Sequence, residues 1–227
     1  MYDIVFISYK EPQADENYSR LKERFPLAKR VHGVKGIHSA HIAAAKKSFT
    51  KMFWIVDGDA VIQNDFDFSY QVPDHQLDHV HVWRSLNPIN DLVYGYGGVK
   101  LFPKKLTLKM DTSKPDMTTS ISDKFRAMPE ISNITKFNTD PFSTWRSAFR
   151  ECVKLSSQVI NRQKSAETLE RLEIWSTVGQ EREFGSYAIA GAIAGKEYGS
   201  NNKDNPEALY KINDFDWLED RFNEQCK

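Results

Sequence analysis

Two aspartates separated by one glycine, Asp57-Gly58-Asp59, are the residues of this sequence with the clearest chemical potential. They follow directly on the apolar, β-rich run 53–56, which is typical of a strand buried on both faces. Mg²⁺ needs only one or two protein carboxylates when waters and substrate phosphates complete its coordination shell. The pair is therefore a candidate site for a divalent cation. The alternative is that Asp and Gly simply form a turn after the strand.

A parallel α/β sheet is predicted to position these carboxylates. The pattern of apolar residues predicts strands near 3–7, 29–34 and 52–56, a helix carrying Tyr18, Leu21 and Phe25, and a helix from Ser39 to Phe49. Strands that alternate with helices are the signature of a parallel sheet. Ligands of such sheets bind outside the carboxyl ends of the strands, where the two aspartates are expected to lie.

The alternation of strands and helices weakens after residue 62. Further strands are predicted near 79–83 and 95–102, and helices over 142–175 in two pieces, 184–196 and 217–222. Residues 111–140 are rich in Ser, Thr, Asp and Pro, which favours a long loop of the kind that often lines a site.

The charges of the chain cancel but are arranged in blocks. Among 227 residues, 31 are basic and 31 acidic. Residues 20–51 carry 9 basic and 1 acidic groups (+8), and residues 52–82 carry 6 acidic groups and no basic one (−6). An acidic block that contains the aspartate pair suits a cation, and the preceding lysines suit phosphates, although both blocks could also be ordinary solvated surface.

Cysteine content and the first residues favour a cytoplasmic protein. Cys152 and Cys226 alone make no disulfide framework, which indicates a reducing compartment. The first residues lack the basic and apolar regions of a signal peptide, and the most apolar late run, 184–195, is too short to span a bilayer.

The run from the buried strand through Asp57 and Asp59 to Val61 resembles the first motif of haloacid dehalogenase-type phosphatases. That resemblance implies that Asp57 is a nucleophile and Asp59 a general acid. Such enzymes usually carry the motif close to the N-terminus and add a lysine and a late acidic pair. Here a strand, a helix and a strand precede the motif, so the phosphatase is the second choice.

The order of motifs is more similar to glycosyltransferases of the GT-A fold over residues 2–105. Phe6-Ile7-Ser8-Tyr9 ends the first strand, 36–45 leads into a helix, the Asp-x-Asp motif follows, and 96–102 resembles the glycine-bearing strand beside donor and acceptor. The resemblance implies an α/β, Rossmann-like, mostly parallel sheet flanked by helices, with a helical C-terminal part. Residues 1–105 would bind a nucleotide sugar, and residues 106–227 would form the acceptor loop and helical part of the same single domain.

The GT-A resemblance also implies roles for individual residues. Asp59 would bind Mn²⁺ or Mg²⁺ directly, and Asp57 would reach the ribose or a metal-bound water. The other implied donor contacts are Ser8 and Tyr9 with the base or ribose, Lys35, Gly36 and His41 with the diphosphate, and Gly97 and Gly98 beside the sugar. The alternatives are that Ser8 and Tyr9 are ordinary strand-end residues, that Lys35 is a solvated lysine and that His41 packs a helix.

Two further roles are less well defined by the sequence. Many metal-dependent relatives supply a C-terminal histidine ligand, but all six histidines lie between positions 32 and 81. A third ligand would then be Asp214, Asp216 or water. An inverting transfer also needs a carboxylate base, and Asp140 is the candidate. Because Pro141 follows it, Asp140 could equally be a helix N-cap.

Trp83, Arg84 and Asn87 follow a predicted strand and could contact an acceptor, since aromatic rings stack on sugars or bases and arginine holds phosphate. Lys46, Lys47, Lys51, Lys100, Lys104, Lys105 and Lys109 could track phosphates or form a solvated face.

Residues 15–18 and 31–38 resemble small glycosyltransferases of tailed bacteriophages. This resemblance implies transfer of glucose or arabinose from a UDP-sugar to 5-hydroxymethylcytosine of double-stranded phage DNA in the host cytoplasm, with extrusion of the base. A glycan or protein acceptor and a non-catalytic nucleotide-sugar-binding module are the other hypotheses. The sugar, the stereochemistry and the oligomeric state are left open.

Overall fold

The structure is a computed structural model that describes residues 1–159 and 164–226. Contacts divide the chain into two compact units. The first contains Met1–Asn87, Val93–Thr112 and Ser120–Lys136, and the second contains Pro88–Leu92, Ser113–Thr119 and the chain from Phe137 onward. The boundary expected after residue 105 therefore falls inside the first unit, which extends to Lys136.

The first unit begins with the predicted alternation of strands and helices. Its elements are β1 (Asp3–Ser8), α1 (Ala14–Arg24), β2 (Lys29–His32), α2 (Ile37–Lys47), β3 (Met52–Asp57), β4 (Ala60–Ile62), η1 (Asp74–Gln76), β5 (Val80–Leu86), β6 (Val93–Tyr94), β7 (Val99–Pro103), α3 (Lys104–Thr107) and β8 (Phe125–Thr135), with α4 (Met117–Ile121) crossing the unit boundary. Helix α2 begins earlier than predicted, so Ser39 is not its N-cap, and Phe49 lies beyond the helix and is 87% exposed.

The strands of the first unit form one mixed sheet. Within the described residues its order is β2-β1-β3-β7-β5-β8-β4, and β6 pairs with β5. Strands β2, β1 and β3 are parallel, as are β5 and β8, but β7 runs antiparallel to both of its neighbours. The α/β class with flanking helices is confirmed. The sheet is mixed and not mostly parallel as expected, because β7 follows β5 and β6 without a helical crossover and lies antiparallel between β3 and β5.

The long loop predicted over 111–140 is wrong, because most of that segment is α4 and the eleven-residue strand β8. Strand β8 pairs with β5 on one side and with β4 on the other. Its buried positions include Ser132, Asn133 and Thr135, whose side chains hydrogen-bond to one another. The strand was not predicted because these polar residues lack the apolar alternation on which strand prediction depends.

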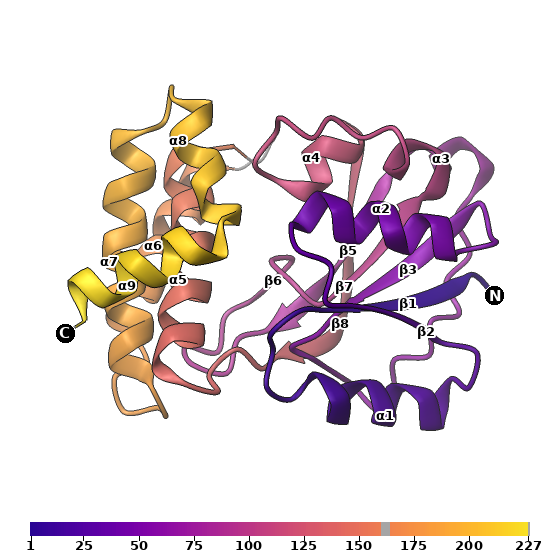
Figure 1. Cartoon of the computed structure of the whole chain (residues 1–227), viewed down its shortest axis with the longest axis horizontal. Coiled ribbons are helices and arrows are strands. Elements are labelled where there is room, and N and C mark those ends of the chain that lie inside the picture. Colours follow the sequence, from indigo (N-terminus) through magenta and orange to yellow (C-terminus); the bar gives the residue numbers. More distant parts are fainter. Residues whose placement is uncertain (160–163, 227) are drawn as a thin grey trace. The chain divides into compact units, whose positions relative to one another are not determined.

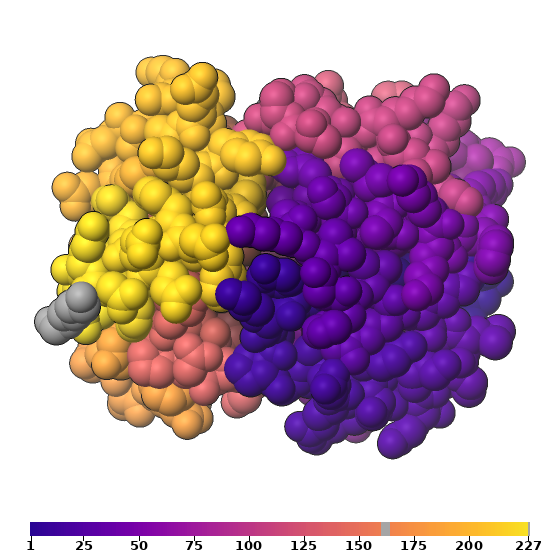
Figure 2. Space-filling view, in the orientation of Figure 1, coloured from indigo at the N-terminus to yellow at the C-terminus, as the bar shows by residue number. Residues whose placement is uncertain are grey.

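The two faces of the sheet have different coverings, since successive side chains of a strand point to opposite faces. Phe6 and Trp54 pack with Leu21 of α1 on one face. On the other face, His41 of α2 lies against Phe102. Figure 1 shows α1 and α2 on opposite sides of the strands, and Figure 2 shows their side chains on the outer surface of the unit. The first unit is thus a helix–sheet–helix sandwich at its N-terminal half.

The second unit is helical, as predicted. Its elements are α5 (Pro141–Ser157), α6 (Ser165–Thr177), α7 (Gly185–Asn201), α8 (Pro206–Tyr210), η2 (Lys211–Asn213) and α9 (Phe215–Gln225). Helix α7 presents Gly191, Gly195 and Gly199 to α5, where a Cβ atom at any of them would overlap the backbone of α5. These three glycines therefore permit close packing of α7 against α5.

Both cysteines are free thiols. Cys152 of α5 is fully buried, and burial together with the neighbouring Glu151 raises the pKa of its thiol well above 9.0. Among the helices of the described ranges, none is both long and apolar enough to cross a lipid bilayer.

Replacing Gly98 by alanine is expected to destabilise the protein more than the same change at Gly33. Both glycines have positive φ, +75° and +73°, but a Cβ at Gly98 would overlap the buried amide of Asn133, whereas nothing lies within 4 Å of one at Gly33. We expect Gly98→Ala to cost about 2–4 kcal/mol of unfolding free energy and Gly33→Ala about 1 kcal/mol. Urea denaturation of both variants measures the difference, and equal losses would contradict the steric explanation.

Candidate functional site

The candidate site lies at the carboxyl ends of the two central parallel strands, β1 and β3. Ile7 pairs with Asp57 in the sheet, so Ser8 and Asp57 end neighbouring strands. The chain leaves β1 towards α1 on one face and enters β3 from α2 on the other. Open α/β sheets bind ligands at such a change of direction between strands. The structure thus brings Ser8, one of the residues predicted to contact the nucleotide sugar, close to the aspartate motif.

Asp57 is held by a lysine of the antiparallel neighbour β7. Its Oδ2 accepts hydrogen bonds from Lys100 Nζ at 2.8 Å and from the backbone N–H of Gly98 at 3.1 Å. The Lys100 side chain is only 12% exposed and that of Asp57 31%. Lys100, which the sequence suggested as a surface lysine, is therefore a component of the site.

The environment of Asp57 favours its charged form. Burial alone would raise the pKa of this carboxyl group, but the attraction and hydrogen bond of Lys100, with smaller contributions from His41 and the Gly98 N–H, lower it below 3.8. Asp57 is consequently an anion whose charge Lys100 already balances.

His41 cannot bring positive charge to a diphosphate at neutral pH. Burial lowers the pKa of its ring to about 4, although Asp57 and the Ile37 carbonyl oppose that shift. Its Nδ1 lies 2.8 Å from the Ile37 carbonyl oxygen, and its ring lies 5.7 Å from that of Phe102. The alternative role, a histidine that packs a helix, describes this geometry best.

The turn that carries Asp59 is fixed by the Asn17 side chain and the Lys136 backbone. Asn17 Nδ2 donates to the Gly58 carbonyl at 3.0 Å, and the Lys136 N–H donates to the Asp59 carbonyl at 2.7 Å. A Cβ atom on Gly58 would lie 2.8 Å from Glu11 Oε2. Glycine at this position therefore leaves room for the Glu11 carboxylate. Sequence reasoning missed Glu11, whose signal was its position three residues after the end of β1.

Ser8 is engaged within the protein at the end of β1. It is 3% exposed, its hydroxyl lies 2.9 Å from His32 Nδ1, and it accepts a hydrogen bond from Arg30 Nε at 3.0 Å. Tyr9 follows and is half-buried, with its N–H donating to Glu11 Oε2 at 2.7 Å. Of these two predicted residues, Tyr9 is the more accessible to a base or ribose.

The N-terminus of α2 is suited to an anion. Gly36 is its N-cap, with φ of +91° and no side-chain capping hydrogen bond, and the first turn contains no acidic residue. Lys35 and Gly36 are both exposed. The first N–H groups of a helix and its dipole favour negative charge, so this end of α2 fits the predicted diphosphate contact.

The glycine-bearing strand is positioned by a buried polar network. Ser85 Oγ lies 2.9 Å from both the Gly97 carbonyl oxygen and Asn133 Oδ1, and Asn133 Nδ2 donates to Thr135 Oγ1 at 3.1 Å. This network lies beneath Gly97 and Gly98, because Cβ atoms there would meet Thr135 and Asn133. The network thereby places the Gly98 N–H that binds Asp57.

The predicted acceptor residues do not form one surface. Trp83 is 1% exposed and packs against Trp54 with 4.5 Å between ring centroids, so its assignment as an exposed acceptor contact is wrong. Trp83 was predicted to be accessible to an acceptor because the sequence does not show which side chains cover each face of the sheet. Arg84 is exposed, and Asn87 is fully buried.

Asp140 and Asp214 both cap helices of the second unit. Asp140 Oδ1 accepts from the Ser143 N–H at 2.8 Å, and Asp214 Oδ1 accepts from the N–H groups of Asp216 and Trp217. The capping alternative for Asp140 is thus present in the structure, and its role as a base stays a prediction.

A metal fits this site only if its ligands are completed by substrate. Across residues 1–159 and 164–226, no three or more His, Cys, Asp or Glu residues are grouped so as to hold an ion. The charge of Asp57 is already balanced by Lys100, and the partly exposed Asp59 stays the predicted ligand. One carboxylate with waters and phosphate oxygens is an arrangement that Mg²⁺ accepts.

Comparison with known proteins adds little to this description. No protein-family model and no curated protein matches the chain. Among solved structures, HddC from Yersinia pseudotuberculosis is similar at 12% sequence identity with a TM-score of 0.38, over 58% of this chain and 92% of that one. The fold is that of an α/β protein with the aspartate pair at the edge of its sheet.

Replacing Lys100 by methionine is expected to destabilise the protein in a pH-dependent way. At neutral pH, leaving Asp57 charged and unpaired should cost about 1–3 kcal/mol of unfolding free energy, less than for a fully buried pair because Asp57 is partly exposed. The ion pair stabilises wild type above pH 3.8, and this contribution is lost as the pH falls through the lowered pKa of Asp57.

In the Lys100→Met variant, burial raises the pKa of Asp57, so its protonation at low pH relieves the penalty. The stability gap to wild type should therefore narrow as the pH falls, as measured by urea denaturation at neutral pH and below pH 3.8. Exposed Lys105 supplies the matched control, Lys105→Met. A gap independent of pH would contradict the ion-pair assignment.

Proposed function

We propose that this protein is a metal-dependent glycosyltransferase that moves a sugar from a UDP-sugar to a hydroxyl group. One observation carries the proposal: Asp57-Gly58-Asp59 ends β3 beside the parallel strand β1, with α1 and α2 on opposite faces. This is the edge at which α/β sheets bind nucleotides. The resemblance of residues 2–105 to GT-A enzymes gives that edge its proposed substrate.

The donor would use three groups along this edge. Tyr9 is placed for the base or ribose, and Asp57 is better suited to accept from a ribose hydroxyl than to bind a metal, because Lys100 already balances its charge. The exposed N-terminus of α2, with Lys35 and Gly36, would bind the diphosphate.

Asp59 would hold Mn²⁺ or Mg²⁺ together with the donor diphosphate. The ion, when bound, neutralises the negative charge that develops on the departing nucleoside diphosphate. Asn17 and Lys136 fix the turn from which Asp59 would hold that ion. Asp140 is the proposed base for the acceptor hydroxyl if the transfer inverts the anomeric centre.

The proposed acceptor is 5-hydroxymethylcytosine of phage DNA, with glucose or arabinose as the sugar. Helices α2 and α3 pack on each other and carry the exposed residues Lys46, Lys47 and Lys105, which supports a surface for DNA phosphates. A glycan or protein acceptor would use the same donor site.

A phosphatase of the haloacid dehalogenase type is a second candidate, and one observation favours it. Such enzymes also carry a lysine in their set of motifs, and Lys100 lies 2.8 Å from Asp57. Strands β1 and β2 and helices α1 and α2 precede the strand that carries the motif, in contrast to that family. The two proposals differ in the role of Asp57, which is a ligand-binding group in one and a covalent nucleophile in the other.

Asp59→Asn is expected to reduce sugar transfer or donor hydrolysis by about 100-fold or more, since it removes the charge that binds the ion. The measurement is release of UDP from a panel of UDP-sugars with Mn²⁺, with Asp204→Asn as the control at an exposed acid. If the protein hydrolysed none of the UDP-sugars, the transferase proposal would be refuted. Mass spectrometry of nucleosides from treated hydroxymethylated DNA then tests the acceptor, and unmodified bases would reject DNA.

Asp57→Asn separates the phosphatase from the transferase. If Asp57 is a nucleophile, wild type should release phosphate from p-nitrophenyl phosphate with Mg²⁺ and the variant should lose this activity entirely, because an amide cannot form the acyl phosphate. The transferase proposal predicts no phosphate release by either protein. Circular dichroism establishes that the variant is folded.

A further inference from the structure

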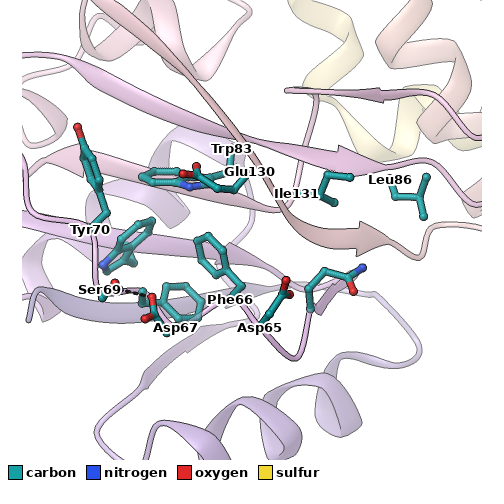
Figure 3. Close-up of a pocket in the computed structure, with 12 residues that line it drawn as sticks. Asp65, Phe66, Asp67, Ser69, Tyr70, Trp83, Leu86, Glu130 and Ile131 are labelled. Carbon is teal, nitrogen blue, oxygen red and sulfur yellow. Dashed lines mark hydrogen bonds between the residues drawn. The ribbon is translucent and has the colours of Figure 1, made fainter.

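A cavity of about 680 Å³ opens on the sheet face opposite Asp57 (Figure 3). Trp54 of β3 and Trp83 of β5 contribute to its wall. Trp54 packs on the α1 face, whereas Asp57, three residues later, points to the α2 face because side chains alternate along β3. The cavity is thus separate from the candidate donor site, and its volume is within the range of small-molecule pockets.

Aromatic rings form the walls of this cavity. Phe66 and Tyr70, which are half-buried, lie with ring centroids 5.9 Å and 5.6 Å from that of Trp83. Trp54 is fully buried, and its indole N–H is without a hydrogen-bond partner among the described residues. The half-buried rings of Phe66 and Tyr70 are therefore the aromatic surfaces that a ligand in this cavity can reach.

The rim of the cavity is acidic. Asp65 and Asp67 follow β4, and Glu130 belongs to β8; all three are exposed and surround the same cavity (Figure 3). The described residues that line it include no lysine or arginine. Three carboxylates repel phosphates and other anions, so the electrostatic complement of this cavity is a cation.

The segment that carries the aromatic and acidic groups is held in place. Arg24 of α1 donates to the carbonyl oxygens of Gln63, Asn64 and Phe66 at 2.8–3.0 Å. Phe68 adopts a positive φ of 57° although it is bulky and 1% exposed. Such strained conformations persist only where the surroundings enforce them, and they cluster at ligand sites.

We infer that this cavity binds a small organic cation of the alkylammonium class. The ammonium group would lie against the half-buried rings of Phe66 and Tyr70, whose faces attract cations, and within the field of the three rim carboxylates. Aromatic walls with an acidic rim distinguish this ligand from a neutral sugar, which gains nothing from the net charge. The inference is independent of the proposed transfer reaction.

The test compares choline with 3,3-dimethylbutan-1-ol, which has carbon in place of the charged nitrogen. Binding to the full chain is measured by isothermal titration calorimetry and by tryptophan fluorescence, since Trp54 and Trp83 line the cavity. We expect saturable binding of choline with a Kd of about 10 mM or tighter, and binding of the neutral isostere at least about tenfold weaker. A third ligand, 1,5-diaminopentane, shows whether primary ammonium groups are accepted.

Two variants locate the binding site. Asp65→Asn combined with Glu130→Gln should weaken choline binding about two- to tenfold, and Tyr70→Leu about two- to thirtyfold. Both carboxylates of the double variant are exposed, so its fold should persist; Glu170→Gln, at an exposed acid of α6, should bind like wild type.

Three results would overturn the inference: equal binding of choline and its neutral isostere, tighter binding of a methyl glycoside, or no saturable binding of either cation. Unchanged affinity in both the double variant and Tyr70→Leu would also overturn it, because the cation would then bind elsewhere. Thermal melting of each variant separates loss of the site from loss of the fold.

Discussion

The ion pair between Asp57 and Lys100 is the interaction on which the organisation of the sheet edge depends. It joins β3 to the antiparallel strand β7, where Ile55 pairs with Lys100. Removing two charges from water is costly, so such a pair persists only with further hydrogen bonds, and the Gly98 N–H supplies one. Gly98 is in turn set by Asn133, so the geometry of one carboxylate extends through β7 to β8.

Much of the N-terminal fold could be predicted because its signals are local. Continuous apolar runs gave β1 and β3, and turn residues after them placed the aspartate pair at a strand edge. Strand β8 could not be predicted, since most of its buried residues are polar, and Asn133 also bonds to Ser85, which is far away in sequence. The environments of Lys100, Glu11 and Trp83 were not predicted either, because each is created by residues that are distant in sequence.

A single strand separates two kinds of chemistry in this protein. Trp54 and Asp57 belong to β3, but alternation of side chains sends one to the aromatic face and the other to the polar face. The polar face contains fixed charges and a neutral histidine, and the aromatic face contains rings with an acidic rim. The two proposed ligands, a nucleotide sugar and an organic cation, would therefore not compete for space.

The burial of Cys152 has a consequence for the chemical reactivity of the helical unit. A thiol must ionise and be reached by a reagent before it reacts, and Cys152 is fully enclosed with a raised pKa. Cys226 is half-buried at the C-terminal end of α9. Alkylation of Cys152 consequently requires α5 to lose its packing first. The rate of Cys152 labelling therefore measures how often the helices packed around it open, and Cys226 is expected to react separately and faster.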